Sequence, residues 1–404
     1  MPDARRTTET LYISNRPAVL RMHRHPLLDG SEPFSVYVGE IQDLGSAPRR
    51  RIRVSGKGHD ISSSRRSCLY EAVERYCCTY RGPFTGGQRA TIAELPNNVH
   101  PADIMLFSES QYEVSHQEQA DPRYHIPAPP LKDLPQTWIE ARSLSEGRTT
   151  FVPAASCYLD FPDRQLGFAC SSGCASGASF EAAATAALLE LIERDAAGIW
   201  WYNKIKRPNI DLKSQSFSAD IVKFFEKRGR LCWMFDITTD INLPVYAALS
   251  MNIRDEPKVA IGFGADLVPD RASAKAILEM AQCWIGIESL FEKSHCSGEI
   301  WDLRSIDLVR DFQFLLPSRA SEPSRTPITM DQLTSDLRAQ GLEPWLVDMK
   351  NPEISIPVVR AFVPGLRHFW PRFGPGRLYD VPIKKQWRDH PTPETHLTKM
   401  SLPL

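Results

Sequence analysis

Two segments of the chain carry the same arrangement of glutamate and arginine. GKGHDISSSRRSCLYEAVER occupies residues 56–75, and ASGASFEAAATAALLELIER occupies residues 175–194. Both end in E-x-x-E-R, and in both the first glutamate lies thirteen residues after a glycine. A weaker third copy follows GFGADL, where Glu279-x-x-Gln282 occurs. The repeat predicts one loop-then-helix unit of fixed length that is used more than once.

These glutamates could hold a divalent cation. Residues three and four apart share a helix face, so Glu71 lies beside Glu74, and Glu190 lies beside Glu193. Paired carboxylates repel each other strongly when buried, so a cation should compensate them. Carboxylate oxygens with little histidine or thiolate nearby favour Mg²⁺ over Zn²⁺, and protein-bound Mg²⁺ usually also bridges nucleotide phosphates. The pattern therefore predicts a magnesium and nucleotide site.

A single E-x-x-E pair also suits an ordinary solvated helix face, and for one copy alone that alternative is the commoner one. The repeat weighs against it, because the second copy lies in a segment so apolar that unpaired glutamates would be costly there. Lys57, between two glycines, could supply a point charge to a phosphate, and the glycines could let the backbone approach it. This tripeptide is weak evidence by itself.

The elements that position these residues follow from hydrophobic periodicity. Apolar residues recur at helical spacing over 62–80, and a more apolar helix is expected over 179–201, buried on most sides. Strands are expected at LCWMFDIT, NLPVYAALSMNI and KVAIGFGADL, followed by a third helix over 272–291. The alternation predicts an α/β or α+β fold.

Four regions are expected along the chain. Residues 1–50 would form an N-terminal cap or edge segment, and residues 51–390 the main domain. Within that domain, residues 81–165 are rich in proline and in short strand signals such as VPAASCYL, so we expect an insertion lobe there. Residues 391–404 are expected to form an extended tail.

Composition excludes several classes of function. A formal net charge of -1 over 404 residues gives no basis for binding nucleic acid. The N-terminus lacks the apolar core of a signal peptide and no apolar run is long enough to cross a bilayer, so a cytoplasmic protein is expected. The nine cysteines are scattered, which favours buried thiols over disulfides or zinc. Lone histidines are expected to be structural, and Trp200-Trp201 to pack at a helix end, with a peptide-facing role as the alternative.

The repeated segments closely resemble the YcaO family. Its members carry an S-x-x-x-E-x-x-E-R helix, an E-x-x-E-R-D helix and a later E-x-x-Q helix around ATP and magnesium, in a fold of pseudo-repeated strand–helix units with a proline-rich C-terminal tail. Further matching segments are FSESQY, ERDAAGIWWYN, VVRAFVPGL and GRLYDVP, so the resemblance covers most of the chain after residue 50. GRLYDVP and the tail are most similar to the azoline-forming cyclodehydratases.

The resemblance implies a reaction and a set of residues. Such enzymes form thiazoline or oxazoline rings from Cys, Ser or Thr of a precursor peptide, using ATP to activate the backbone amide. Magnesium ligands would be Glu71, Glu74, Glu190 and Glu193. Nucleotide contacts would be Lys57, Ser67, Arg75, Arg194, Glu279 and Gln282. The terminal carboxylate of Leu404 would act as a proton acceptor, although the last four residues hold one proline only.

The resemblance also implies partners. A separate leader-peptide-binding protein, E1-like or winged-helix, is expected, because the first motif already appears near residue 57. A flavin-dependent dehydrogenase acting later and a homodimer are further expectations by analogy. Many relatives have Asn and Glu where this chain has Ala178 and Ala182. Thioamide or amidine formation and a non-catalytic scaffold that binds ATP or peptide therefore stay open as alternatives.

Overall fold

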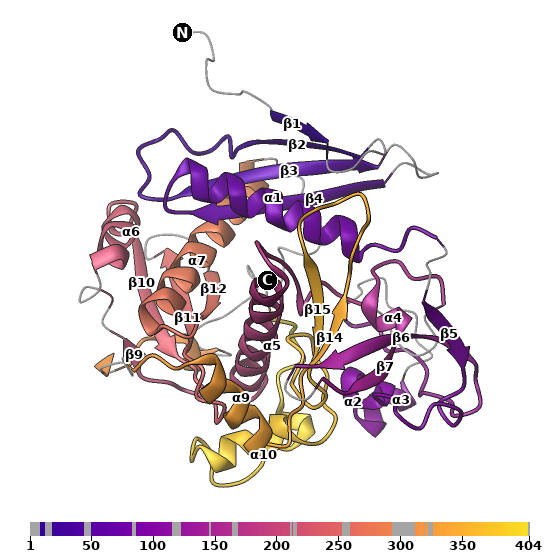
Figure 1. Ribbon diagram of the computed structural model, residues 1–404. Coiled ribbons are helices and arrows are strands. Elements are labelled where there is room, and N and C mark those ends of the chain that lie inside the picture. Colours follow the sequence, from indigo (N-terminus) through magenta and orange to yellow (C-terminus); the bar gives the residue numbers. More distant parts are fainter. Residues whose placement is uncertain are drawn as a thin grey trace.

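The computed structural model describes most of the chain. The described residues are 9–12, 18–43, 50–82, 86–114, 123–144, 147–163, 169–210, 212, 216–252, 259–292, 312–318, 320, 321 and 326–402. Helices and strands alternate along them, and three sheets form the framework (Figure 1). The α/β fold predicted from the sequence is confirmed.

The strands form one N-terminal sheet and two sheets farther along the chain. The first sheet is antiparallel with the order β1-β2-β3-β4, and contains β1 (Glu9–Tyr12), β2 (Ala18–Arg24), β3 (Ser35–Asp43) and β4 (Arg50–Gly58). The second has the order β12-β11-β10-β9-β13, and contains β9 (Asn209–Ile210), β10 (Arg230–Asp236), β11 (Val245–Asn252), β12 (Ala260–Ala265) and β13 (Ala320–Ser321). The third has the order β5-β6-β14-β15-β8 with β7 paired to β6, and contains β5 (Gly87–Ala90), β6 (Gln136–Ser143), β7 (Thr149–Pro153), β8 (Cys174–Ser176), β14 (Trp345–Asp348) and β15 (Val358–Phe362).

Three long helices lie between and against these sheets. They are α1 (Ile61–Cys78), α5 (Phe180–Tyr202) and α7 (Pro269–Glu292). Their bounds agree with the three predicted helices to within a few residues. The shorter helices are α2 (Pro101–Met105), α3 (Glu109–Glu113), α4 (Ala154–Cys157), α6 (Ser216–Glu226), α9 (Met330–Ala339) and α10 (Arg377–Lys384), with 3₁₀ turns η3 (Gln313–Leu315) and η4 (Glu394–His396).

Helix α1 packs directly against the first sheet. It starts after Asp60, whose side chain accepts a hydrogen bond from the Ser63 backbone N–H in a capping box. Glycine at position 56 is required by the close approach of this helix, because a Cβ there would lie 2.1 Å from the backbone nitrogen of Cys68. Packing therefore explains Gly56, in place of the predicted approach of the backbone to a phosphate. The strand β4 and the helix α1 thus form one rigid strand–helix unit.

Helix α7 meets the second sheet in the same way. A Cβ at Gly262 of β12 would lie 2.0 Å from the backbone nitrogen of Met280, so the helix rests directly on the strand. The contact leaves Glu279 and Gln282 on the helix side that faces the first sheet, as their bonds to β4 show. The third copy of the pattern therefore forms its own strand–helix unit.

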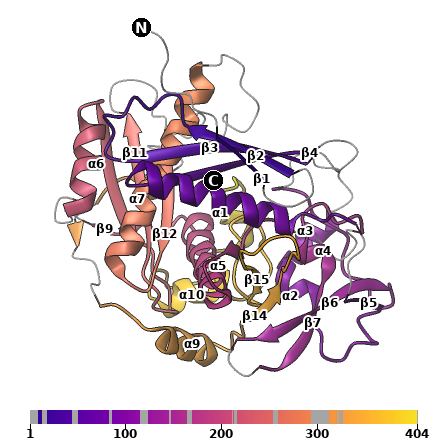
Figure 2. The same ribbon diagram turned by 45° about the horizontal axis from the view of Figure 1, so that its top comes forward.

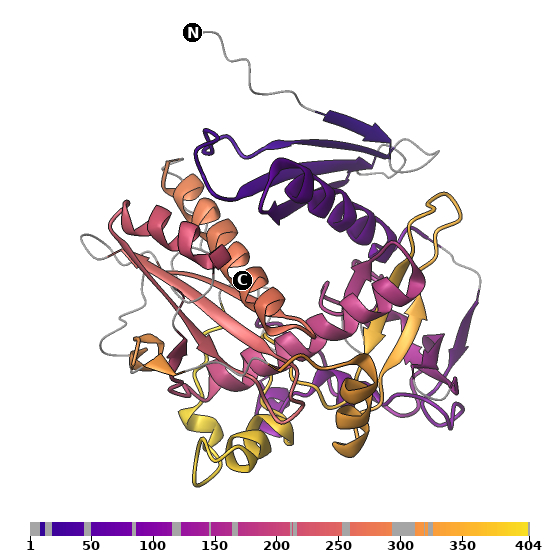
Figure 3. The ribbon, with the colours of Figure 1, turned by 60° about the vertical axis from the view of Figure 1, so that its left-hand side comes forward.

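Helix α5 runs through the centre of the molecule, between α7 and the strands β14 and β15 (Figures 1 and 3). Its alanine-rich first half packs against β8 and β15, and its second half carries Trp200 and Trp201, both completely buried. The Trp201 indole N–H donates to the Met400 carbonyl at 2.9 Å. Both tryptophans pack the core at the helix end, as predicted, and their burial excludes the peptide-facing alternative.

Some expectations are corrected by the structure. The strand signal of VPAASCYL is confirmed only at Val152 and Pro153, which end β7, whereas Ala154–Cys157 form the short helix α4. Alanine has the highest helix propensity, which explains the change. Segment 81–165 supplies β6, which pairs with β14, and residues 9–43 supply three strands of the β4 sheet. These pairings join both segments to the rest of the fold, while the predicted domain boundaries stay predictions.

The described cysteines are all free thiols, and most of them are buried. Cys296 lies outside the described residues. Among the described helices, none has the length and apolar character needed to cross a bilayer.

Candidate active site

A cleft of about 1060 Å³ opens where β4, α1, α5 and α7 come together. Figure 2 shows α1 lying across the ends of the other two helices. The residues predicted from the sequence that line it are Lys57, Ser67, Glu71, Glu74, Arg75, Glu190, Arg194, Glu279 and Gln282. The three copies of the pattern are therefore brought to one cavity, although they are more than 200 residues apart at the extremes. Contacts between β4 and α7 bring the first and third copies together in the fold.

On α1, Glu71 and Glu74 face the cleft beside Arg75. A Glu71 carboxylate oxygen accepts a hydrogen bond from the Ser55 backbone N–H at 3.2 Å, and Arg75 Nη2 lies 3.5 Å from the other oxygen. Burial raises the pKa of Glu71, and Arg75 only partly offsets this. For Glu74, burial and the negative charge of Glu190 hold the pKa well above its ordinary value. The acids are thus undercompensated by cations.

On α5, Arg194 is shared by two glutamates. Its Nη2 donates to Glu190 Oε1 at 3.4 Å, and its Nη1 lies 3.5 Å from Glu193 Oε1. The second Glu190 oxygen accepts from the Gly173 backbone N–H at 3.2 Å. Glu193 is buried beneath the cleft, and burial raises its pKa to about 7, although Arg194 acts to lower it. Of the four predicted ligands, Glu193 is the one that does not line the cleft wall.

Two bonds tie α7 to β4 across the cleft. Lys57 Nζ lies 2.5 Å from Glu279 Oε2, and Gln282 Nε2 donates to the Ser55 hydroxyl at 2.7 Å. Burial would raise the pKa of Glu279, but the positive charges of Lys57 and Arg194 outweigh it and lower the pKa. The first and third copies of the pattern are therefore in direct contact.

Sequence reasoning missed several residues of the cleft. Ser55 bridges α1 and α7 through its backbone N–H and its hydroxyl, and its position one residue before the Gly-Lys-Gly segment was the available signal. Lys275 lies one helical turn before Glu279, and its Nζ pairs with Asp266 at 2.7 Å. Arg66, Tyr70 and Arg123 also line the cleft. Isolated basic and aromatic residues like these carried no pattern in the sequence.

The cleft suits Mg²⁺ and phosphate in its chemistry, although its carboxylates are not gathered around one point. Among the described residues, no three His, Cys, Asp or Glu side chains are close enough to hold a metal ion, so the four ligand assignments stay predictions. The donors are carboxylate oxygens, which Mg²⁺ prefers, and the raised pKa values of Glu71, Glu74 and Glu193 mark acids that a cation would stabilise. Within the described part of the chain, the Nε atoms of Arg75 and Arg194 are buried without a hydrogen-bond partner, as expected for groups that bind an anion.

A family comparison identifies this arrangement. The family model described as YcaO cyclodehydratase, ATP- and Mg²⁺-binding, matches residues 55–367, which contain all three copies of the pattern. The chain belongs to the YcaO family. ATP and Mg²⁺ are accordingly the cofactors of this YcaO enzyme, and the family's reaction class is ATP-dependent cyclodehydration.

Similar proteins support the same family. A solved structure described as a heterocyclase in complex with substrate and cofactor is 30% identical, with a TM-score of 0.86 over 95% of this chain and 54% of that chain. The heterocyclase TruD is also 30% identical, with a TM-score of 0.74 over 84% of this chain and 50% of its own. This YcaO chain therefore spans about half the length of those heterocyclase chains. An uncharacterized protein of Methanothermobacter thermautotrophicus is 27% identical over 78% of this chain and 82% of its own.

The arrangement can position a nucleotide against a second substrate. When bound, ATP would supply a phosphoryl group that makes a poor oxygen leaving group a good one, and Mg²⁺ would neutralise charge on the phosphates. In this chain, Lys57, Arg75 and Arg194 place positive charge around the cleft, where anionic phosphates would be bound. Glu279 holds Lys57 in place through their ion pair. The cleft volume lies at the upper end of the roughly 300–1,000 Å³ typical of small-molecule pockets.

The C-terminal tail packs into the fold, whereas the two alanines that depart from the family pattern lie at the surface. Ser401 and Leu402 are buried, and the Ser401 backbone N–H donates to the Tyr124 hydroxyl at 3.0 Å. Leu404 lies outside the described residues, so its proposed role is untested. Ala178 and Ala182 are exposed near the start of α5, and neither is among the residues lining the cleft.

Proposed function

We propose that this YcaO enzyme activates backbone amides of a precursor peptide with ATP and Mg²⁺, forming thiazoline or oxazoline rings from Cys, Ser or Thr. In this reaction the side-chain thiol or hydroxyl loses its proton as it adds to the preceding carbonyl carbon, and the former carbonyl oxygen receives the γ-phosphoryl group. That oxygen leaves as phosphate when the C=N bond of the ring forms and the amide N–H proton is lost. Ring formation removes the elements of one water.

One observation carries the proposal. Acidic residues from α1 and α5 and the Lys57–Glu279 pair of β4 and α7 are gathered in one cleft, in a chain that matches a heterocyclase structure along 95% of its length. The cationic side chains around that cleft, which include Lys57, Arg75 and Arg194, suit the phosphates that the proposed reaction consumes and releases. The remaining volume would receive the extended peptide.

Two alternatives to cyclodehydration are considered: a reaction with a different nucleophile, and a protein that binds its ligands without catalysis. A YcaO enzyme that forms thioamides or amidines would activate the same amide oxygen but add an external nucleophile. A non-catalytic scaffold is the second alternative, because Ala178 and Ala182 are too short to make the contacts of the family's Asn and Glu, and neither alanine lines the cleft. A leader-binding partner, a later flavin-dependent dehydrogenase and a cytoplasmic location stay predictions.

The test is mass spectrometry of a precursor peptide encoded beside this gene. The peptide is incubated with the protein, ATP, Mg²⁺ and any adjacent leader-binding protein, and ADP release is measured in parallel. We expect the peptide to lose the mass of one water per ring, with both water loss and ADP release absent in Glu74→Gln and Glu190→Gln. The matched control is Glu181→Gln, because Glu181 is an exposed acid on α5, the helix of Glu190. This variant should behave as wild type.

The other outcomes separate the alternatives. A mass gain from replacement of oxygen by sulfur would indicate a thioamide. Unchanged peptide mass with peptide-dependent ADP release absent would contradict the enzyme proposal and favour the scaffold.

A further inference from the structure

A second, smaller cavity lies next to the nucleotide cleft, at the other side of Arg194. Its volume is about 70 Å³, and it is lined by residues of α2, α4, α5, β15 and the segments 170–172 and 366–372. Two liquid water molecules occupy about 60 Å³ in total. The cavity is therefore large enough for one small molecule such as a tetrahedral oxyanion, and too small for a nucleotide or a peptide.

Unsatisfied hydrogen-bond donors gather around this cavity. Among the residues that the structure describes, the Ser156 hydroxyl, Arg360 Nε and Arg367 Nε are buried and have no hydrogen-bond partner. The three residues are 2%, 4% and 3% exposed, respectively. A buried donor without a partner costs about 1–3 kcal/mol, and more when it is charged, so three at one cavity need an explanation. All three are donors, which indicates that the missing partner is an acceptor.

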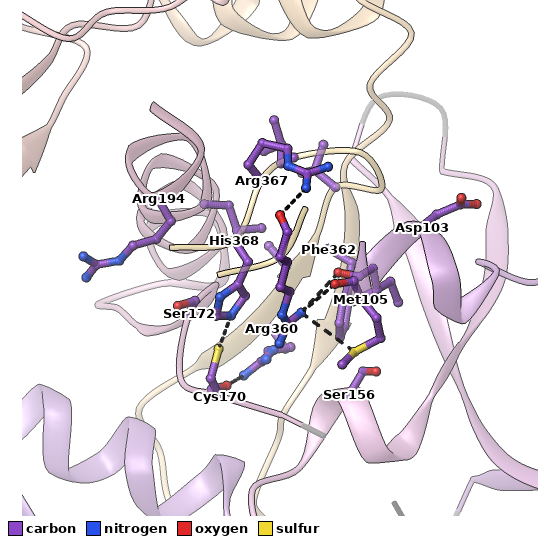
Figure 4. Close-up of a pocket in the computed structure, with 16 residues that line it drawn as sticks. Asp103, Met105, Ser156, Cys170, Ser172, Arg194, Arg360, Phe362, Arg367 and His368 are labelled. Carbon is purple, nitrogen blue, oxygen red and sulfur yellow. Dashed lines mark hydrogen bonds between the residues drawn. The ribbon is translucent and has the colours of Figure 1, made fainter. Parts of the chain in front are cut away.

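The charge around the cavity is strongly positive. Its lining includes Arg194, Arg360, Arg367 and Arg372, against one carboxylate, Asp103. Asp103 is exposed, and in Figure 4 its carboxylate points away from the arginines. Within the described residues, neither Arg360 nor Arg367 forms an ion pair, and the Arg360 Nη1 atom instead donates to the Cys170 carbonyl at 2.6 Å. Arg367 Nη2 donates to the Arg372 carbonyl at 2.6 Å, and Asp195 is the acid whose charge acts on Arg367. Buried guanidinium groups without a direct ion pair are unfavourable, so the cavity attracts an anion.

His368 adds a further sign of this positive field. Its Nδ1 accepts a hydrogen bond from the Trp370 backbone N–H at 2.9 Å, so a neutral ring carries its proton on Nε2, which lies 3.0 Å from Cys170 Sγ (Figure 4). Burial, followed by the charges of Arg372 and Arg194, holds the pKa of His368 well below its ordinary value. The His368 ring is therefore neutral and adds no positive charge to the cavity. Its contact with Cys170 holds the segment 170–172 in place.

We propose that this cavity is a binding site for a small oxyanion, of which inorganic phosphate is the physiological example, held by Arg360, Arg367 and Ser156. The site is separate from the nucleotide cleft, although Arg194 lines both. The inference goes beyond the proposed function, because phosphate binding needs neither peptide nor turnover. Its failure would leave cyclodehydration untouched.

The test measures binding of radiolabelled inorganic phosphate by equilibrium dialysis. The full-length protein is first saturated with a non-hydrolysable ATP analogue and Mg²⁺, so that phosphate cannot occupy the nucleotide cleft. We expect one phosphate per chain to bind in addition. Ser156→Ala should weaken this binding about tenfold, because it removes one hydrogen bond to a charged group, and Arg360→Met should abolish it.

Two design features keep the result interpretable. Ser156→Ala removes an unsatisfied buried hydroxyl, so it should not destabilise the fold, even if Arg360→Met does. The matched control is Ser218→Ala, because Ser218 is also buried with an unpartnered hydroxyl but lies in α6, outside the cavity. It should bind phosphate like wild type.

Three results would overturn the proposal. They are no phosphate binding in the millimolar range, binding that the ATP analogue displaces completely, and binding that Ser156→Ala and Arg360→Met leave unchanged. In each case the cavity would hold water only.

Discussion

Replacing Glu193 by glutamine should stabilise the metal-free protein while removing its ATP-dependent activity. Glu193 is buried under the cleft with 11% of its side chain exposed. Burial raises its pKa from 4.5 to about 7 even though Arg194 lies nearby, so its ionised form is disfavoured by folding. Glutamine has the same shape as the neutral acid and carries no charge. The substitution therefore removes an unfavourable charge from the folded state.

The size of the effect follows from the pKa difference and depends on pH. One pKa unit corresponds to about 1.4 kcal/mol, so the shift makes the folded protein less stable at pH 8 by about 3 kcal/mol. Because the folded-state pKa is raised, this penalty is absent well below pH 4.5, grows as pH rises and is complete above pH 7. At pH 5 about 1 kcal/mol of it is present. Glu193→Gln should thus gain about three times more stability at pH 8 than at pH 5.

The assay is urea denaturation of wild type and Glu193→Gln at both pH values, in the presence of a chelator, followed by ATP hydrolysis with Mg²⁺. Glu181→Gln is the matched control, because Glu181 is exposed on the same helix. Equal stability of Glu193→Gln and wild type at pH 8, or the same difference at pH 5, would refute the reasoning. Full ATP hydrolysis by the variant would refute its assignment as a magnesium ligand.

Three further predictions concern the ion pairs and the close packing of the fold. Lys57→Met should lower the free energy of unfolding by about 2–3 kcal/mol, because it leaves the half-buried Glu279 carboxylate without its partner. Adding Glu279→Gln should restore most of this loss, as measured by urea denaturation in a double-mutant cycle. Gly56→Ala should reduce the soluble yield or lower the free energy of unfolding by more than about 3 kcal/mol, since its Cβ would lie 2.1 Å from a backbone nitrogen of α1. Gly286→Ala should instead stabilise α7 by about 1 kcal/mol, because no atom lies within 4 Å of the added Cβ. Arg377→Met should cost about 3–5 kcal/mol in thermal or urea unfolding, because it leaves two buried aspartates without their shared partner. A loss under 1 kcal/mol for Lys57→Met or Arg377→Met, or equal effects of the two glycine substitutions, would contradict these estimates.

The helices and the chemical character of the site could be predicted because both are repeated patterns. Helix α5 is recognisable from its continuous apolar periodicity, and two glutamates inside such a helix stand out because burial makes them costly. Lys57, Glu279 and Gln282 were assigned by resemblance to the family, and the structure brings all three together through β4 and α7. Their contact depends on the register of two separate sheets, which no local pattern encodes.

Other parts of the site could not be predicted for physical reasons. Ser55 acts through its backbone N–H as well as its hydroxyl, and backbone donors carry no residue-type signal. Arg360 is assigned to an oxyanion site only because burial and the lack of a partner are visible in three dimensions. Gly56 was considered for phosphate binding, but the approach of α1 explains it, since sequence spacing cannot distinguish space needed by a ligand from space needed by a helix.

The cleft is also the junction between the layers of the protein, and this links its stability to its ligands. The first sheet with α1 meets the other layers through polar bonds at the cleft, including Lys57 to Glu279, Gln282 to Ser55, and the Ser176 hydroxyl to the Tyr70 carbonyl at 2.9 Å. The acids of α1 and α5 act against these bonds, because Glu74 and Glu190 repel each other across the same junction. Any cation bound between them would remove the repulsion and leave the bonds unopposed. The charges that make the cleft suitable for Mg²⁺ are therefore the same charges that make the junction weaker without it.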